Sequence, residues 1–420
     1  MNPTWIAGGI FLITYALIVS ERIHRTIAAL LGGMAIILVG VLNQDQAFHA
    51  IDWNVIFLLA GMMMIATVLR ETGLFQWIAI QSVRMGKGNP YRIMVILVLV
   101  TAVTSALLDN VTIVILMAPV TLFITASLRI NPMPFLIALI LSSNIGGTAT
   151  LVGDPPNILI GSAAGIDFVT FAANLAPIVF IILIAFIGLA WFLFKKDLQV
   201  PNIDTLNIEA LDTSELITNQ PLLQKSLVVM AGVILGFLFH GALHLEPATV
   251  ALTGATVLVL WGRNDLHHVL QEIEWTTLFF FIGLFILVEA LVEVGIIEVV
   301  AQAALRLTDG NLQMTSILLM WFSAVASGVV DNIPYTATMI PVVENLGKAM
   351  PVGPLWWSLA LGACLGGNAT LVGAAANVVV ANLAEKSGQP ISFGLFLCYG
   401  AITTFLSLVL ASLYVWIRYL

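Results

Sequence analysis

The sequence predicts an all-α protein that crosses a membrane many times, and three observations carry this prediction. Of its 420 residues, 60% are hydrophobic and only 9% are charged, whereas a soluble domain has about 25% charged residues. The mean hydropathy is +1.05. Apolar runs of roughly 18 residues or more, long enough to cross a bilayer as helix, recur along the chain. This composition excludes a cytosolic enzyme and a disulfide-stapled domain, and the net charge of −8 without a basic patch excludes a nucleic-acid binder.

The apolar runs are separated by charged residues and define the elements in chain order. In the first half they lie near 4–20, 26–42, 54–69, 93–128, 134–164 and 170–194. A polar, acidic stretch follows at 195–224, which we expect to be a cytoplasmic linker. In the second half the runs lie near 226–243, 248–262, 276–292, 312–345, 355–382 and 392–417. The chain is therefore expected to divide into residues 1–194 and 225–420.

The positions of the basic residues predict the orientation. Suppose that the N-terminus is outside and that the long runs 93–128 and 312–345 each return to the side where they start. Then only Arg306, Lys348 and Arg418 of the 15 Lys and Arg residues lie outside. Because basic residues concentrate on the cytoplasmic side, we expect ten crossings of the inner (plasma) membrane with both termini outside. Charge does not distinguish re-entrant hairpins from pairs of full crossings in the two long runs.

The two halves of the chain are copies of one another. At an offset of 222 residues, the Asp-Asn pair at 109–110 matches the Asp-Asn pair at 331–332. At an offset of 220, the segment 146–157 matches 366–377 at eight of twelve positions. Each half has five crossings, an odd number, so the second copy enters the membrane from the opposite face. Inverted repeats of this kind are typical of secondary transporters, whose sites lie near the midplane where helices are interrupted.

Two aspartates occupy repeat-equivalent positions inside apolar runs. A charged Asp at the centre of a membrane helix costs about 2.5–3.5 kcal/mol, so Asp109 and Asp331 need a reason. One interpretation is capping, in which the side chain accepts hydrogen bonds from backbone N–H groups at the tip of a hairpin. The other is that each carboxylate binds a coupling ion, either a proton or sodium. The candidate ion-coupling residues are Asp109, Asn110, Thr112, Asp331, Asn332 and Thr336.

Glycine-rich segments at 146–157 and 366–377 interrupt two further apolar runs. Glycine costs a helix roughly 1 kcal/mol relative to Ala, and non-helical backbone at membrane depth is tolerated where it lines a cavity or is buried in protein. The Thr and Asn side chains of these segments predict a polar substrate cavity, whereas close helix packing would explain only the glycines. The candidate substrate-binding residues are Asn144, Gly146, Gly147, Thr148, Thr150, Gly153, Asp154, Asn157, Gly366, Gly367, Asn368, Thr370, Gly373 and Asn377.

Asp154 differs from the other candidates because its counterpart in the second half is Ala374. Asp before Pro is a helix-start signal, so Asp154 is interpreted either as a cap or as a third titrating carboxylate. A half-helix that begins at Pro155 would direct its positive end toward the cavity, which suits an anion or an oxyacid.

Motifs of common enzyme classes are absent from the sequence. It contains no nucleotide-binding loop, no His-Glu-x-x-His motif and no nucleophile elbow. We therefore expect no catalytic residues, no bound metal, no cofactor beyond the coupling ion and no nucleic-acid partner. An ATP-driven pump would need its ATPase subunit on another chain.

The motifs resemble the ion transporter superfamily, which groups ArsB-type arsenite permeases, NhaD-type sodium/proton antiporters, the melanosomal P protein and divalent anion/sodium symporters. The resemblance covers nearly the whole chain, and it is carried by residues 108–112, 144–157, 331–338 and 362–373. Within the superfamily the chain is most similar to the P-protein and ArsB-like branch.

The resemblance implies re-entrant hairpins with tips at 109–110 and 331–332, and helices unwound at 146–157 and 366–377. It also implies a transport domain that slides against a scaffold in an elevator-type mechanism, and a homodimer formed through that scaffold. In the sodium-coupled dicarboxylate symporters of the superfamily the tips read Ser-Asn-Thr, and Asp replaces that Ser here in both halves, which favours proton coupling.

The predicted function is therefore proton-coupled efflux of a small inorganic oxyanion or oxyacid, with arsenite or antimonite as the first choice. The alternatives are a sodium/proton antiporter and an anion or dicarboxylate transporter or channel.

Overall fold

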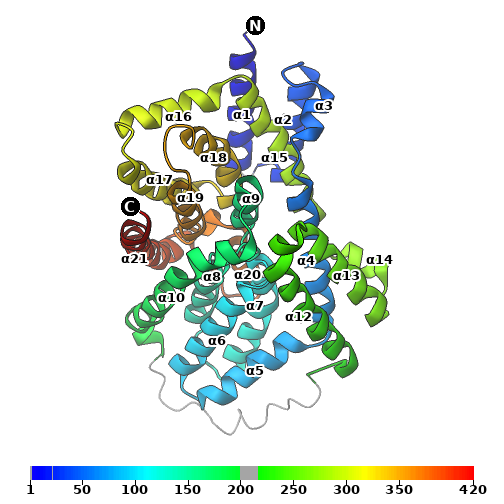
Figure 1. Cartoon of the computed structure of the whole chain (residues 1–420). Helices are drawn as coiled ribbons and strands as arrows, with labels where there is room; N and C mark the ends of the chain where they lie inside the picture. The colour runs from blue at the N-terminus through cyan, green and yellow to red at the C-terminus, as the bar shows by residue number, and fades with distance from the viewer. Residues whose placement is uncertain (1, 21, 199–215) are drawn as a thin grey trace.

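The computed structural model describes residues 2–20, 22–198 and 216–420, and within these ranges the chain forms helices and no strand (Figure 1). The linker expected at 195–224 therefore lies largely outside the described residues. The helices of the first half are α1 (Pro3–Ser20), α2 (Arg25–Leu38), α3 (Gln44–His49), α4 (Trp53–Glu71), α5 (Leu74–Gly86), α6 (Pro90–Ser105), α7 (Asn110–Ser127), α8 (Met133–Gly147), α9 (Pro155–Ala164) and α10 (Phe168–Leu198). Those of the second half are α12 (Gln220–Leu243), α13 (Pro247–Gly262), α14 (Leu266–Gln271), α15 (Trp275–Glu293), α16 (Ile296–Leu307), α17 (Leu312–Val329), α18 (Asn332–Leu346), α19 (Gly353–Gly366), α20 (Ala375–Lys386) and α21 (Phe393–Tyr419). The all-helical prediction is confirmed.

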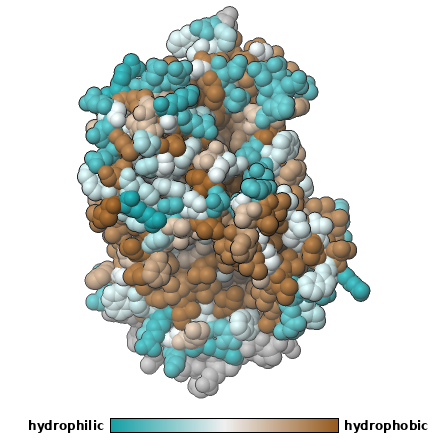
Figure 2. Space-filling model, viewed as in Figure 1, coloured by the Kyte–Doolittle hydropathy of each residue, from teal (hydrophilic) through white to brown (hydrophobic). Residues whose placement is uncertain are grey.

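The helices have the length and surface of a multi-pass membrane protein. Among the described residues, eight helices are long and apolar enough to cross a membrane: α1, α4, α7, α10, α12, α15, α17 and α21. Shorter apolar helices include α2, α6, α8 and α13. Large apolar side chains point outward, for example Leu12, Phe192 and Leu260, which are 68%, 76% and 79% exposed. Figure 2 shows apolar residues gathered over the lower half of the visible face and hydrophilic residues toward both ends. Such a large apolar surface suits contact with lipid chains.

The repeat in the sequence is also present in the helix bounds. α4 and α15 are related by an offset of 222 residues at both ends, and α9 and α20 begin 220 residues apart. Corresponding helices exchange partners between the halves: α4 packs on α13 and α15 on α2, while α7 packs on α20 and α18 on α9. α5 and its counterpart α16 lie at opposite ends of the molecule (Figure 1), as inverted copies require. The two copies are therefore interlocked.

Each long apolar run folds back on itself at its aspartate. α6 ends at Ser105 and α7 begins at Asn110, while α17 ends at Val329 and α18 begins at Asn332. The two hairpins and the two interrupted helices pack on one another, and we call α6–α9 and α17–α20 the carrier helices. α2, α4, α13 and α15 pack on each other beside them, and we call these the scaffold helices (Figure 1). The hairpin tips pack within the carrier helices.

Four helices between the spans are absent from the sequence prediction. α5 and α16 follow Gly73 (φ 77°) and Gly295 (φ 78°), whose left-handed backbone turns the chain sharply at the ends of α4 and α15. α16 then places Glu298, Gln302 and Arg306 four residues apart on one face, which is typical of an amphipathic helix at a membrane interface. α3 and α14 are helices of six residues. A search for long apolar runs passes over these four helices because each is short and polar residues interrupt its apolar ones.

Candidate functional site

The hairpin tips and helix breaks of both halves meet in the middle of the carrier helices. The backbone N–H of Asn110 donates to the carbonyl of Gly153 (3.1 Å), which joins the first tip to the first break. The Asn332 side chain donates from Nδ2 to Oδ1 of Asp154 (3.3 Å), which joins the second tip to the first break. The structure therefore brings candidates from distant segments of the sequence into one site.

Asp109 and Asp331 both cap the helix that follows them. Asp109 accepts hydrogen bonds from the Thr112 N–H (3.0 Å) and the Thr112 hydroxyl, and Asp331 accepts one from the N–H of Ile333 (3.0 Å). Capping is worth about 1 kcal/mol, but it does not need a charge because Asn caps as well as Asp. Asp109 is only 6% exposed, and the side chain of Asp331 is 14% exposed. Capping thus explains the position of both aspartates and does not require their charge.

An amide network crosses between the two halves at Asn144. Its Nδ2 donates to Oδ1 of Asn368 and to Oδ1 of Asn377, each at 2.9 Å, and its own Oδ1 accepts from Nδ2 of Asn110 (3.1 Å). All four side chains are buried. Because buried amides need their partners, this network fixes the first tip relative to the second break.

The other polar candidates hold the breaks in shape. Asn157 donates to the carbonyl of Thr150 (2.9 Å), and its counterpart Asn377 donates to the carbonyl of Thr370 (2.8 Å). The Thr150 hydroxyl donates to the carbonyl of Ala106, just after α6 (2.5 Å), and the Thr370 hydroxyl donates to the carbonyl of Gly328, at the end of α17 (2.6 Å). Thr148 and Thr336 donate to carbonyls of their own helices. These donors are used within the protein, so substrate binding by these side chains stays a prediction.

The breaks are shorter than the segments that the sequence suggests. α8 continues through Gly147 and α9 begins at Pro155, so the first break covers 148–154; the second covers 367–374 and contains a short 3-10 turn, η1 (Leu371–Gly373). Gly146 and Gly366 are therefore helical. A Cβ on Gly146 would lie 2.2 Å from the carbonyl oxygen of Ala102 on α6, and one on Gly366 would lie 2.5 Å from Ala324 on α17. Close helix packing, the alternative interpretation, explains these two glycines.

The small residues inside the breaks also permit close backbone contact. A Cβ on Gly153 would lie 2.5 Å from the carbonyl oxygen of Gly147, and one on Gly373 would lie 2.8 Å from that of Gly367. Each break thus folds back onto the end of the helix before it. The same contact occurs in both halves, so the duplicated glycines have a duplicated structural role.

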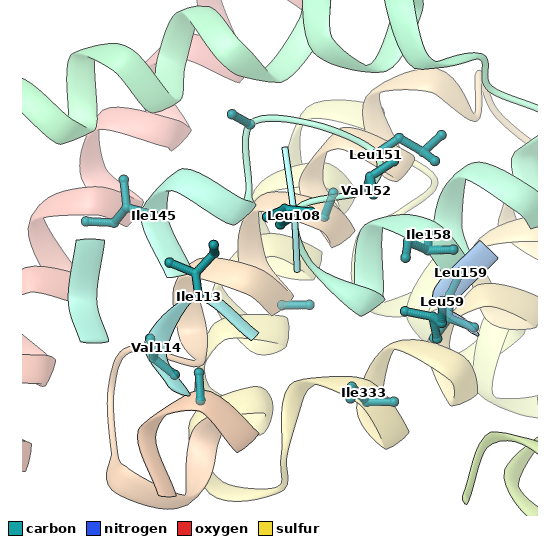
Figure 3. Close-up of a cluster of buried hydrophobic side chains, with 14 of the residues drawn as sticks. Leu59, Leu108, Ile113, Val114, Ile145, Leu151, Val152, Ile158, Leu159 and Ile333 are labelled. Carbon is teal, nitrogen blue, oxygen red and sulfur yellow. The ribbon is translucent and has the colours of Figure 1, made fainter. Parts of the chain in front are cut away.

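Asp154 is a buried carboxylate that caps nothing. It stands at the N-cap position of α9, but its side chain makes no capping hydrogen bond. It is fully buried, and in the part of the chain that the structure describes its Oδ2 has no hydrogen-bond partner. Apolar side chains from both hairpins, including Leu108 and Ile333, gather with Val152 and Ile158, which flank Asp154 in the sequence (Figure 3). Of the two interpretations of Asp154, the cap is wrong.

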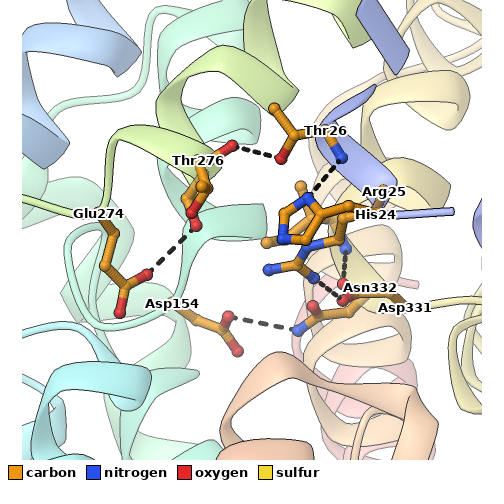
Figure 4. Close-up of polar contacts among 10 residues, drawn as sticks. His24, Arg25, Thr26, Asp154, Glu274, Thr276, Asp331 and Asn332 are labelled. Atoms are coloured by element: carbon orange, nitrogen blue, oxygen red, sulfur yellow. Dashed lines mark hydrogen bonds and ion pairs between the residues drawn. The ribbon is translucent and has the colours of Figure 1, made fainter. Parts of the chain in front are cut away.

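Two charged residues at the site were missed by sequence reasoning. Arg25, interpreted from the sequence only as a cytoplasmic basic residue, places Nη1 2.6 Å from Oδ2 of Asp331. Glu274 is half-buried and accepts a hydrogen bond from Thr277 (3.2 Å). Figure 4 shows Glu274, Asp154 and the Arg25–Asp331 pair around a common space. Arg25 is the first residue of α2, and Glu274 directly precedes the first residue of α15. A charged residue at the start of an apolar helix is ordinarily expected at a membrane surface, and only the folded structure shows that these two lie at the site.

Cavities adjoin the site. One of about 390 Å³ lies beside the Arg25–Asp331 pair, between α1, the second hairpin tip and α20. A smaller one of about 50 Å³ lies between α4, α7 and the segment before α15, and Thr112 and Glu274 line it. Arg70 and Glu272 form an ion pair at this smaller cavity, and the Arg70 guanidinium lowers the pKa of the Glu272 carboxyl.

Removing the Asn144 side chain is expected to destabilise the site. Asn144→Ala leaves the buried oxygens of Asn368 and Asn377 without their donor, at a cost of about 1–3 kcal/mol for each unsatisfied group. The melting temperature in detergent should fall well below that of Asn382→Ala, which removes an exposed amide from α20. Equal melting temperatures for the two variants would show that the network contributes nothing to stability.

Two interlocked repeats of interrupted membrane helices around a buried polar site define this protein as a membrane transporter. The chain belongs to the CitMHS family, described as citrate transporter, which it matches over residues 15–362. It is 47% identical to an uncharacterized transporter of Mycobacterium tuberculosis H37Rv, over 99% of this chain and 98% of that protein. It is 34% identical to the P protein of Homo sapiens, over 92% of this chain and 57% of that protein. The resemblance to the ion transporter superfamily and to the P protein is confirmed.

A solved structure shows the same fold. The YdaH transporter of Alcanivorax borkumensis, described as having an unusual topology, aligns with a TM-score of 0.56 at 13% sequence identity, over 99% of this chain and 98% of that one. At this identity the likeness concerns the fold alone. It agrees with the predicted polytopic all-helical fold.

Proposed function

We propose that this protein is a proton-coupled secondary transporter of a small oxyacid, with arsenite or antimonite as the first choice of substrate. The observation that carries the proposal is the charge of the site. Asp109, Asp154, Asp331 and Glu274 lie at or beside it. Of the guanidiniums that the structure describes nearby, Arg25 pairs with Asp331, and Arg70 is already paired with Glu272. A free anion would meet net repulsion there, whereas arsenite is an uncharged acid at neutral pH. An uncharged oxyacid can use the polar groups of the site without adding to its negative charge.

Buried carboxylates are suited to coupling by protons. A carboxylate without a cationic partner is costly to carry through an apolar interior, so Asp109 and Asp154 are expected to cross between the two sides in a protonated form. Since Asp109 sits on a hairpin tip and Asp154 on a helix break, both would move with the carrier helices. Release of the proton on one side and its uptake on the other would couple this movement to the proton gradient.

The division into scaffold and carrier helices supports an elevator-type movement. The scaffold helices α2, α4, α13 and α15 pair with each other, and the carrier helices likewise pack among themselves. A group that holds both hairpin tips and both breaks can move as a body, because its internal hydrogen bonds are retained. With the orientation that the basic residues predict, N-terminus and C-terminus outside the inner membrane, the cavity beside Arg25 would face the cytoplasm.

The excess of acidic groups also favours a second candidate, sodium/proton antiport. Carboxylate and amide oxygens are ligands for hard cations, and Asn110 Oδ1 and Asp154 Oδ2 are buried oxygens without a hydrogen-bond partner among the described residues. The name of the family mentions citrate. Citrate carries several negative charges at neutral pH, so in this site it would have to travel with neutralising cations.

Proteoliposomes with an imposed pH gradient test the proposed function. Arsenite, sodium, citrate and chloride are added in turn, while a trapped dye reports internal pH and protein-free liposomes serve as control. We expect arsenite to move internal pH, and the pH gradient to drive arsenite against its own gradient. A pH response to sodium alone would replace the proposal by sodium/proton antiport. Chloride flux without any movement of protons would indicate a channel.

A further inference from the structure

An ion pair links the scaffold helices to the second hairpin tip. Arg25 begins α2 in the scaffold, and its Nη1 lies 2.6 Å from Oδ2 of Asp331, which caps α18 in the carrier. The guanidinium also lies 5.4 Å from the centre of the Phe280 ring on α15, a cation–π contact. The two charged side chains are 28% and 14% exposed, so water screens the pair only in part. The pair must break whenever the carrier moves past the scaffold.

The groups around the pair make Asp331 dependent on Arg25. His24 precedes Arg25 and accepts a hydrogen bond from the backbone N–H of Thr26. Two acidic residues that the structure describes also lie near the pair: Glu274, from the segment before α15, interacts with Arg25, and Asp154, from the first break, interacts with Asp331 (Figure 4). Within 4 Å, Arg25 is the one cationic partner of Asp331 among the residues that the structure describes. A carrier that moved away from Arg25 would leave this carboxylate among other carboxylates.

The other half of the molecule cannot form the same pair. At the offset of 222 residues the counterpart of Asp331 is Asp109, but the counterpart of Arg25 is Pro247 at the start of α13. Asp109 is instead satisfied by the N–H and hydroxyl of Thr112, within its own hairpin. The two aspartates are equivalent in sequence and differ in electrostatic surroundings. Asp331 has a scaffold cation within 4 Å, and among the described residues Asp109 forms no ion pair.

We propose that Arg25 is a positioning residue for transport: it holds the second hairpin tip to the scaffold until a proton or sodium takes its place on Asp331. The coupling ion and the guanidinium then compete for one carboxylate. An unloaded carrier stays attached to α2, and a loaded carrier is free to move. Because Pro247 replaces Arg25 in the other half, this attachment acts in one of the two access states. The inference rests on the proposed function for the movement of the carrier helices and for the identity of the coupling ion.

The cavity beside the pair gives the competing ion a route. Its volume is about 390 Å³, and Arg25, Asp331 and the exposed Asn382 line it together with apolar residues of α1 and α20. Water and a small cation can therefore reach the carboxylate from the side where Arg25 stands. His24 also lines the cavity, and the remaining lining residues are apolar, so the Asp331 carboxylate is the one acidic group on its wall among the described residues.

Cross-linking tests whether Arg25 holds the tip in place. Ile23→Cys and Val330→Cys introduce thiols on the scaffold side and the carrier side of this cavity, in a Cys398→Ser background that leaves only the buried Cys364. A short bismaleimide should join them in purified protein.

Adding Arg25→Gln should slow cross-linking roughly fivefold or more, because the attached state loses population. Arg25→Lys should keep most of the rate, and Arg22→Gln, which removes an exposed arginine of the same loop, should keep all of it.

A double-mutant cycle keeps the test valid if Arg25→Gln folds poorly. In an Asp331→Asn background the partner charge is gone, so adding Arg25→Gln should change the cross-linking rate no further. No cross-linking in the parent, an equal effect of Arg22→Gln, or a full effect of Arg25→Gln in the Asp331→Asn background would each overturn the proposal.

Proton leak without substrate gives a second readout. In proteoliposomes that contain no transported solute, Arg25→Gln should raise the dissipation of a pH gradient roughly fivefold, because unloaded carriers are then free to move. Cross-linking needs no substrate, so a failed substrate panel with a positive Arg25 result would reject the proposed substrate and keep this inference. Leak and cross-linking both equal to the parent would reject the inference and leave the proposed function untouched.

Discussion

Replacing Asp109 by Asn is expected to reduce transport driven by a pH gradient while the protein stays folded. Asparagine is an equally good N-cap, so the hydrogen bond from the Thr112 N–H to the tip is retained. The variant cannot take up and release a proton. We expect a decrease of about 10- to 100-fold, the factor that corresponds to losing about 1.5–3 kcal/mol of interaction with an ionised group. The measurement is the initial rate of arsenite uptake into proteoliposomes under an imposed pH gradient.

Two variants separate the charge of Asp109 from its cap. Asp52 caps α4 in the same way, through the N–H of Val55 (3.1 Å), and it lies outside the site. Asp52→Asn should therefore transport like the parent. Asp109→Ala removes the cap as well as the charge, so its melting temperature should fall by an amount that reflects about 1 kcal/mol. If Asp109→Asn transports at the parental rate, Asp109 is a cap and nothing more.

Adding one methyl group at Gly146 is expected to destabilise the whole carrier. A Cβ there would lie 2.2 Å from the carbonyl oxygen and 2.4 Å from the Cα of Ala102, and backbone atoms cannot move aside as a flexible side chain can. α8 would have to separate from α6 and carry the first break with it. Overpacking of this kind costs about 1–3 kcal/mol. Melting temperature and the monodisperse fraction in size-exclusion chromatography measure the loss.

A glycine in an open position provides the control for Gly146→Ala. A Cβ on Gly188 in α10 would meet no heavy atom within 4 Å, so Gly188→Ala should gain roughly 1 kcal/mol of helix stability or change nothing. Gly366→Ala, the repeat-equivalent change beside Ala324, should behave like Gly146→Ala. Equal melting temperatures for Gly146→Ala and Gly188→Ala would contradict the close contact between α6 and α8.

The alternatives left open at the aspartates were resolved by geometry. Asp109 and Asp331 each turn out to be caps, so the capping interpretation holds without excluding ion coupling. Asp154 stands before Pro155 in a helix-start motif, but its side chain makes no capping bond. Its side chain is instead directed toward Asn332 on the other half's hairpin tip. A local sequence motif predicted the start of α9 and could not predict where the side chain would find its partner.

The sequence by itself determined the apolar runs and the duplication, because apolar length and repeated motifs are properties of neighbouring residues and their spacing, and the hairpin tips followed from the resemblance to a known family. Only the tertiary structure decided which of those residues meet. Arg25 and Asp331 are 306 residues apart in the chain, and Asn144 and Asn377 are 233 apart. Pairings over such distances depend on how the two interlocked copies pack against each other, and local sequence patterns do not specify that packing. The same packing placed a helix-start arginine inside the site and turned two repeat-equivalent aspartates into groups with different surroundings.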